Sequence, residues 1–352
     1  MTTKTTSGRL QVPDPVQRRR SSPRPVGKLL AVLALSAVAA CGGNGTGAET
    51  GAPGAPPSPT SGGAAESTAL RIAFVPATTA LPLHVAAAQG FFEDNNLDVT
   101  LTAAANISDI PSTLGRQFDL AIGTATDLIR AGSAGVDVVQ VSGNTVNTKD
   151  NPFVRVIVPA GKGIEDFGDL GDKTLGSPTL SGVIHIGTLY TAKQQGVDPA
   201  TVKGVQVPPP NLPDQLEAGR VDGVEALEPF ASQLVKAGNA SLGDPFSAIA
   251  DPLATNFYIS QGEWAEANKE AIGRFVTAME QAAAFIEEKP EESRAILQEY
   301  TGLPAPVAAS VPLPTYDFEI RAEDLDKWVD VLEELGQLEG DVDTSKLVLS
   351  GR

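Results

Sequence analysis

The sequence is poor in the residues that build metal and redox sites. Its 352 residues include one cysteine and two histidines. A single cysteine excludes a disulfide framework and a multi-cysteine metal centre, and two histidines leave little room for histidine-based metal chemistry. Aromatic residues are only 5% of the chain, which argues against an aromatic cage for a sugar or a cation. We therefore expect no metal and no cofactor.

Positive charge is also scarce. The chain has 26 basic and 43 acidic residues, a net charge of −17. Residues 1–40 hold seven of the basic residues and one acid, so the remainder is more acidic still. Such a body repels nucleic acid and anionic lipid headgroups, and we expect no nucleic-acid partner. A hydrophobic content of 41% is ordinary for a globular protein and excludes general disorder and a polytopic membrane protein.

The N-terminal segment is typical of a secretory signal peptide. A basic stretch, residues 18–28, precedes a twelve-residue, largely apolar run at 29–40. That run is too short to span a bilayer, which takes about 20 residues, but it suits the apolar region of a signal peptide. Small residues end it just before Cys41, as in a bacterial lipobox. We predict a lipoprotein signal peptide over 1–40 and lipidation of Cys41. The alternatives are an ordinary signal peptide with an incidental cysteine, or a twin-arginine signal.

Residues 41–68 consist largely of Gly, Ala, Pro, Ser and Thr. This composition cannot bury a core, so the segment should be a flexible tether. A lipid at one end and a globular body at the other predict a protein on the extracytoplasmic face of the cell membrane. The lipid anchor would be its sole membrane contact.

From residue 70 onward, short strand-like runs alternate with helical runs, and the order occurs twice. This alternation predicts an α/β fold with two lobes, each a mostly parallel sheet flanked by helices. The first copy has predicted strands at 70–75, 97–103 and 118–123 and predicted helices at 82–88 and 108–117. The second copy has predicted strands at 174–176, 205–207 and 221–226 and predicted helices at 181–196 and 212–218.

Two connections between the lobes can be predicted. Ser142–Asn151 is polar and lacks a helical period, so we interpret it as the first crossover loop. Leu253–Ser260 is a lone strand followed only by helices, which must pack on an existing lobe. The chain should therefore return near residue 250. This assigns 69–145 and 252–352 to lobe 1 and 146–251 to lobe 2, with two hinge crossovers.

Facing sheets place candidate ligand contacts in one cleft. In open parallel sheets, ligands bind beyond the carboxyl ends of the strands, at helix N-termini. The loops at these ends are rich in hydroxyls, which suit a small polar or anionic ligand, although the same side chains can merely cap helices. The candidate hydroxyl contacts are Thr78, Thr79, Thr124, Thr126, Ser177, Thr179 and Ser181.

Six further residues complete the candidate site. His84 and His185 lie near the starts of the two equivalent helices, where they could bind an anion, bridge a metal or simply pack locally. Glu225 and Glu228 could accept hydrogen bonds from a ligand or suit a helix dipole. Asn144 and Asn256 lie near the two crossovers, where a closing cleft would enclose them.

Five segments after residue 89 follow a recognisable order: residues 90–99 (GFFEDNNLDV), 118–123 (FDLAIG), 169–176 (DLGDKTLG), 216–222 (LEAGRVD) and 228–230 (EPF). Together they resemble one family, the periplasmic-type substrate-binding proteins of ABC importers. The similarity is greatest to the branch that includes sulfonate-, taurine- and nitrate-binding proteins and binders of thiamine-pyrimidine precursors. One segment departs from the branch pattern, because Asp172 stands where a glycine is usual.

The resemblance implies a two-lobed periplasmic-binding-protein fold and a monomer that is not an enzyme. It implies capture of a small polar or singly charged organic solute, such as a sulfonate, nitrate, an aromatic carboxylate or a thiamine-precursor-like compound. The partners would be ABC permease subunits with a cytoplasmic ATPase. A ligand-sensing lipoprotein coupled to a sensor kinase, and an enzyme on the same fold, remain as alternatives. The cleft loops show no clear arginine or lysine, which disfavours a dianion.

Overall fold

The computed structural model describes residues 67–104, 107–338 and 340–351. The expected signal peptide (1–40), Cys41 and the tether up to residue 66 lie outside the described residues. Among the residues that the structure describes, no helix has the length and apolar character needed to cross a membrane.

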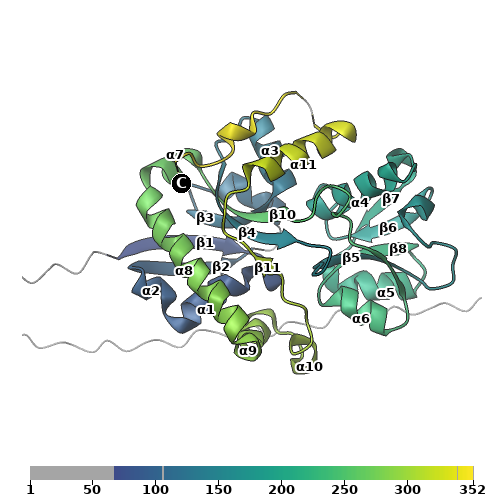
Figure 1. The fold of residues 1–352 in the computed structure, drawn as a ribbon, viewed down its shortest axis with the longest axis horizontal. Coiled ribbons are helices and arrows are strands. Elements are labelled where there is room, and N and C mark those ends of the chain that lie inside the picture. The colour runs from purple at the N-terminus through teal and green to yellow at the C-terminus, as the bar shows by residue number, and fades with distance from the viewer. Residues whose placement is uncertain (1–66, 105–106, 339, 352) are drawn as a thin grey trace, which may run out of the picture. The chain divides into compact units, whose positions relative to one another are not determined.

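The described residues form two β-sheets flanked by helices (Figure 1). The first sheet has the order β11-β4-β10-β3-β1-β2. Within it, β1 pairs in parallel with β2 and β3, whereas β10 and β11 join antiparallel. Its strands are β1 (Thr68–Phe74), β2 (Leu97–Ala103), β3 (Leu120–Thr124), β4 (Val139–Asn147), β10 (Leu253–Ser260) and β11 (Thr315–Tyr316).

The second sheet has the order β7-β6-β8-β5-β9. Strand β6 pairs in parallel with β7 and β8, and β5 runs antiparallel between β8 and β9. Both sheets are therefore mixed, although most strands of each run in one direction, and the expected α/β fold is confirmed. The first strand after each crossover, β5 in the second sheet and β10 in the first, runs in the opposite direction. The strands are β5 (Val154–Val158), β6 (Thr174–Ser177), β7 (Lys203–Gln206), β8 (Gly223–Leu227) and β9 (Ala240–Gly243).

Helices cover both faces of each sheet. In Figure 1, α1, α8 and α9 lie on one side of the first sheet and α3 and α11 on the other, while α4 lies across the second sheet from α5 and α6. The helices of the first copy are α1 (Leu81–Gln89), α2 (Phe91–Asp94) and α3 (Ala125–Ser133). Those beside the second sheet are α4 (Val183–Gln194), α5 (Leu212–Glu217) and α6 (Phe230–Lys236). The C-terminal helices are α7 (Gly262–Ala267), α8 (Lys269–Glu288), α9 (Pro290–Thr301), α10 (Ala305–Ala308) and α11 (Ala322–Glu334).

Alternation along β1 divides the core of the first sheet into two layers. Ile72 and Phe74 pack toward α1 and α8, against side chains such as Phe275. Ala73, between them, belongs to the opposite layer, which contains Trp328 of α11. Successive strand residues point to opposite faces, so a strand covered by helices on both sides is apolar throughout.

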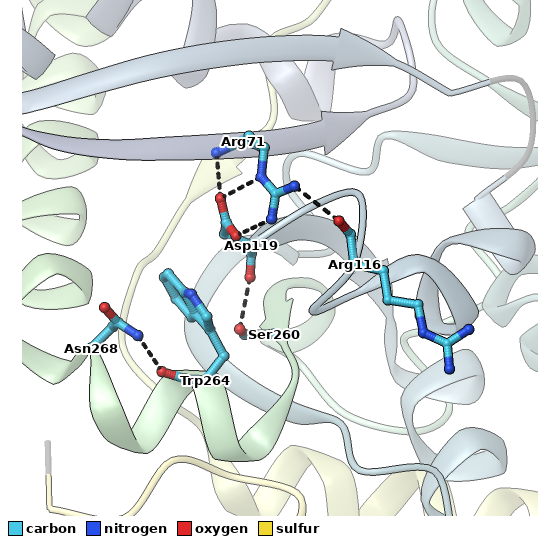
Figure 2. Close-up of polar contacts among 6 residues, drawn as sticks. All are labelled: Arg71, Arg116, Asp119, Ser260, Trp264 and Asn268. Carbon is cyan, nitrogen blue, oxygen red and sulfur yellow. Dashed lines mark hydrogen bonds and ion pairs between the residues drawn. The ribbon is translucent and has the colours of Figure 1, made fainter.

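Each copy of the repeat carries the same aspartate clamp between neighbouring strands. In the first sheet the carboxylate of Asp119, just before β3, accepts from the backbone N–H of Arg71 at 2.8 Å and from its guanidinium at 2.6 and 3.0 Å (Figure 2). Ser260 of β10 donates to the backbone carbonyl of Asp119 at 2.7 Å. In the second sheet Asp222 likewise accepts from the N–H of Thr174 at 2.8 Å. These aspartates therefore fix strand register.

Residues 142–147 of the segment interpreted as a crossover loop belong to the strand β4, so a loop is wrong for that part, and residues 148–151 lie between β4 and β5 of the second sheet. All nine residues of β4 are buried. Their polar groups find partners far away in the sequence: Ser142 donates to the Phe318 carbonyl, and Asn147 donates to Asp244. Buried polar side chains are tolerated when they are hydrogen-bonded. Without those partners in view, the polar sequence resembles a loop.

Two local predictions also fail. Ser181 was expected to be the N-cap of the helix after β6, but it is exposed; the N-cap is Gly182, one residue later, and α4 begins at Val183. The helix predicted over 108–117 is instead a 3₁₀ segment, Ile107–Thr113, with Pro111 inside it. Proline removes a backbone donor, which disfavours a continuous α-helix there. The strand–helix order of both copies is otherwise confirmed.

Candidate functional site

A cavity of about 370 Å³ lies between the two sheets, beyond the carboxyl ends of their parallel strands. Segments that follow β1 and β3 line it from the first sheet, and segments that follow β6 and β7 line it from the second. This is the edge at which α/β sheets bind ligands. One side of the cavity, here called the polar wall, consists of Thr78, Thr79, Thr124, Asp127 and Asn256.

The start of the polar wall is held by side chains that lie outside the cavity. The carbonyls of three consecutive residues, 77–79, accept hydrogen bonds from three different elements. Tyr300 of α9 donates to Ala77 and Tyr316 of β11 to Thr78, both at 2.7 Å, and Asn144 of β4 donates to Thr79 at 3.1 Å. These bonds fix the orientation of the peptide groups of residues 77–79 where they border the cavity.

The start of α3 supplies the acidic part of the polar wall. Thr124 is the N-cap of α3: its hydroxyl accepts from the backbone N–H of Asp127 at 3.3 Å. The same hydroxyl donates to the Asp127 carboxylate at 2.7 Å. Both residues are buried. Asp127 is the one charged side chain among the described residues that line the cavity.

The opposite side of the cavity, here called the apolar wall, comes from the second sheet. Phe153 precedes β5 and stacks on Phe246, with ring centroids 5.9 Å apart. The aromatic ring, prolines and branched side chains of this wall offer apolar contact, and they have few rotamers to lose when a solute binds. The apolar wall consists of Phe153, Val183, Ile184, Pro208, Pro209 and Leu227. Thr179 and Gln206 add polar groups on this side.

Arg130 links the two sides next to the cavity. It lies one helical turn after Asp127 in α3, and its guanidinium donates to the carbonyl of Ser181 and to the Gln337 side chain. Burial lowers the pKa of Arg130, and the negative charge of Asp127 opposes that effect. Arg130 therefore joins α3 of the first sheet to the loop that precedes α4 of the second.

The structure brings five of the thirteen predicted ligand contacts to the cavity: Thr78, Thr79, Thr124, Thr179 and Asn256. The other eight lie elsewhere. Of these, Thr126 and Ser177 are buried beside the lining, and Ser177 donates to the carbonyl of Thr179 at 3.1 Å. Asn144 supports the polar wall from behind, and the carbonyl of Ser181 accepts from Arg130. The remaining four are His84, His185, Glu225 and Glu228.

The two histidines occupy separate environments. His84 stacks on Tyr300 at 3.8 Å between ring centroids and meets Phe74 edge-on. Burial lowers the pKa of His84 to about 4, so its imidazole is neutral at pH 7 and unsuited to binding an anion. His185 instead contacts Glu225 through Nδ1 at 2.9 Å. Burial alone would lower the pKa of His185, but the charge and hydrogen bond of Glu225 raise it.

Glu228 also has a structural partner. Its carboxylate pairs with Arg155 of β5 at 2.7 Å and accepts from the Ser232 hydroxyl at 3.0 Å. Glu225 and Glu228 thus bind protein groups, and neither lines the cavity. No group of three or more His, Cys, Asp or Glu side chains suited to a metal ion occurs in the described part of the chain.

Sequence reasoning missed Asp127 and the apolar wall. The signal for Asp127 was present, because it follows the N-cap Thr124 by three residues, the spacing of a capping interaction. Pro208 and Pro209 could have been noticed because they separate the strand β7 from the helix α5, at the end of a strand where ligands bind. Phe153 had no local signal, since its place in the wall depends on where β5 enters the second sheet.

Comparison with known proteins identifies the family. A family model described as NMT1/THI5 like matches residues 77–293, more than half of the chain. The chain belongs to the NMT1/THI5-like family. This NMT1/THI5-like protein is 27% identical over 222 residues to the 4-amino-5-hydroxymethyl-2-methylpyrimidine phosphate synthase THI11 of Saccharomyces cerevisiae. The match covers 58% of this chain and 63% of the yeast protein, less than two thirds of its length.

Solved structures give the fold of this NMT1/THI5-like protein. The periplasmic aliphatic sulphonate binding protein SsuA of Escherichia coli is similar with a TM-score of 0.69 at 21% identity, covering 80% of this chain and 98% of SsuA. The periplasmic nitrate-binding protein NrtA of Synechocystis is similar with a TM-score of 0.65 at 17% identity, covering 79% and 84%. The expected periplasmic-binding-protein fold is confirmed.

Proposed function

We propose that this NMT1/THI5-like protein is the solute-binding component of an ABC importer. It captures a small organic solute in the cavity between the two sheets and delivers it to membrane permease subunits that work with a cytoplasmic ATPase. The observation that carries the proposal is the cavity itself, about 370 Å³ and lined from both sheets. That volume suits a small organic molecule, and binding pockets commonly combine apolar walls with a few polar groups.

The two sheets would act as lobes that close on the solute. The predicted lobes, 69–145 with 252–352 and 146–251, would correspond to the two sheets, with β4 carrying the first sheet two residues past the predicted boundary, to Asn147. A solute held between such lobes needs them to separate for entry and to approach for capture. We place the protein on the extracytoplasmic face of the cell membrane, as a monomer anchored by lipidated Cys41.

The yeast relative is named a synthase, which raises an enzyme as a second candidate. The chemistry of the cavity favours binding. Its described lining contains no lysine, histidine or cysteine to serve as a nucleophile or to hold a covalent intermediate. The two histidines are engaged by Tyr300 and Glu225.

A blocking variant tests the proposal. Ile184 lines the cavity, so Ile184→Trp should fill it, whereas Val235→Trp adds the same ring at an exposed site on α6. Thermal unfolding is followed with sulfonates, nitrate, carboxylates and organic amines. A solute at 100 times its Kd stabilises the folded state by about 2.7 kcal/mol.

We expect a stabilising solute to reduce the radius of gyration in small-angle scattering of the wild type and of Val235→Trp. Ile184→Trp should show neither effect. Stabilisation that survives in Ile184→Trp, with no compaction in any variant, would contradict the proposal.

A further inference from the structure

Asn256 of β10 is a buried amide in the cavity lining. It pairs with Thr124 of β3 on one side and with Thr145 of β4 on the other. Only 7% of Asn256 is exposed, yet the residue lines the cavity. A polar side chain so deeply buried needs a partner for each end of its amide. An end that the protein leaves unpaired is therefore available to a solute.

The oxygen of this amide is taken by two threonine hydroxyls. Thr145 and Thr255 each donate to Asn256 Oδ1 at 3.2 Å. Both threonines are completely buried, and neither hydroxyl has another acceptor among the described residues. Reversing the amide would leave two buried O–H donors unpaired, which is costly. The two hydroxyls therefore hold the amide with Oδ1 toward them and Nδ2 away from them.

The nitrogen of the amide has no partner of its own. In the described part of the chain, no group accepts a hydrogen bond from Asn256 Nδ2, and the atom is not sealed in the core. An amide nitrogen of this kind carries two N–H donors and accepts nothing. A solute oxygen placed beside it would receive a hydrogen bond that the protein itself does not use.

The peptide groups of residues 77–79 add further donors to the polar wall. Tyrosine hydroxyls hold the carbonyls of Ala77 and Thr78, each at 2.7 Å. In a trans peptide the N–H points opposite to the C=O, so the N–H groups of Thr78 and Thr79 point away from those hydroxyls. Within the described residues, neither N–H has an acceptor. Both residues line the cavity, where a solute oxygen could accept from them.

The charges near the polar wall are compatible with an acceptor. The Asp127 carboxylate accepts from the Thr124 hydroxyl at 2.7 Å, and its charge interacts with Arg130. The first turns of α3 and α4 both border the cavity, and the N-terminus of a helix favours groups of negative charge. Asn256 thus offers a donor in a cavity where the helices favour an acceptor.

Resting on the proposed function, we propose that Asn256 selects solutes whose head is a hydrogen-bond acceptor, a carboxylate or an amide carbonyl, and that Thr145 and Thr255 are positioning residues that hold its amide N–H groups toward the solute. The head would lie against Asn256 and Thr78, and the remainder of the solute would contact the apolar wall. A head that only donates, such as an amidinium, would meet the donor of Asn256 and find no acceptor there.

Three probes of similar shape test the selection. Benzoate, benzamide and benzamidine share one ring and a planar head. The first head only accepts, the second accepts and donates, and the third, when charged, only donates. Their binding is measured by calorimetry at pH 8 on the wild type and on Asn256→Asp, which keeps an oxygen for the two threonines and replaces the Nδ2 donor by an acceptor. The control Asn96→Asp adds the same charge at an exposed position.

We expect the wild type and Asn96→Asp to bind benzoate and benzamide more tightly than benzamidine. Asn256→Asp should weaken benzoate binding about tenfold or more, as loss of a hydrogen bond to a charged group predicts, and should make benzamidine the preferred probe. Equal loss of all three probes in Asn256→Asp would mean that Asn256 only supports the sheet, and would overturn the proposal.

A second variant leaves the charge of the protein unchanged. Thr145→Val with Thr255→Val removes both hydroxyls that orient the amide, so Oδ1 can turn toward the solute. Benzamidine should then bind more tightly than it binds the wild type, and the ratio of benzoate to benzamidine affinity should fall. A loss shared in equal proportion by the three probes would contradict the positioning role of the two threonines.

Other outcomes separate this inference from the proposed function. If the wild type binds benzamidine as tightly as benzoate and benzamide, the acceptor proposal fails while solute binding stands. If Asn256→Asp leaves the order of the three affinities unchanged, the assignment of Asn256 fails. If no probe and no member of the earlier solute panel binds at millimolar concentration, both the acceptor proposal and the proposed function fail.

Discussion

Replacement of Gly143 by alanine links the stability of the fold to the site. Gly143 lies in the buried strand β4, where its N–H donates to the carbonyl of Phe318 at 3.1 Å. A methyl group there would come within 3.0 Å of the backbone carbonyl oxygens of Asp317 and Glu319, closer than real Cβ atoms approach. Because the obstacle is backbone and is hydrogen-bonded to β4, it cannot rotate away as a side chain could.

Overpacking of this kind lowers the free energy of unfolding by about 1–3 kcal/mol. Because the carbonyls that the new methyl group meets cannot move aside, we expect Gly143→Ala to cost about 3 kcal/mol. At about 2–3 °C per kcal/mol for a large domain, the Tm should fall by about 6–9 °C. The displaced segment includes Tyr316, which donates to the Thr78 carbonyl in the polar wall, so solute affinity should fall as well.

Thermal unfolding by circular dichroism and titration calorimetry measure both effects. The matched control is Gly273→Ala in α8, where a Cβ would meet nothing within 4 Å. That change should stabilise the protein by about 1 kcal/mol, since alanine favours a helix over glycine. A Gly143→Ala protein that unfolds at the wild-type Tm would refute the reasoning.

Three further predictions follow from the described contacts. Tyr316→Phe leaves the Thr78 carbonyl without its donor and should cost about 1–3 kcal/mol of stability; calorimetry should also show weaker solute binding, and equal affinity would remove any role for this bond in positioning the wall. Arg155→Met leaves buried Glu228 unpaired and should destabilise the protein by about 3–5 kcal/mol; adding Glu228→Gln should recover most of this in chemical denaturation, and no recovery would contradict the pairing argument. Burial lowers the pKa of His84 from 6.5 to about 4. The folded state therefore favours the neutral imidazole, and the stability that this residue contributes is complete above pH 6.5 and is lost as the pH falls toward 4. His84→Phe should therefore reduce acid destabilisation by about 1–2 kcal/mol after allowance for solvent screening, and an unchanged pH profile of unfolding would disprove this origin.

Much of the fold could be predicted from local patterns. Strand–helix alternation, the N-cap at Thr124 and the stop of α1 at Gly90 depend on neighbouring residues, and all three are found in the structure. The nature of β4 could not be predicted in this way, because polar Ser142 and Asn147 are stabilised by partners about a hundred or more residues away. Antiparallel entry of β5 and β10 likewise depends on how the chain crosses between the sheets.

The site shows the same division. Hydroxyl residues after strands, such as Thr78 and Thr179, follow from the rule that ligands bind at the carboxyl ends of parallel strands, and the structure places them in the cavity lining. The sequence could not tell that His185 and Glu225 would contact each other, 40 positions apart. It also could not show that Phe153 and Asp127 would line the same cavity, since one precedes β5 of the second sheet and the other lies in α3, beside the first.

The most direct test of the account is a crystal structure of the protein with the tightest-binding solute of the panel. The account predicts electron density for the solute between the two sheets, with its polar head against Thr78 and Asn256 and its body against Phe153 and Leu227. Density for the solute at any other place, with solvent alone between these walls, would contradict it.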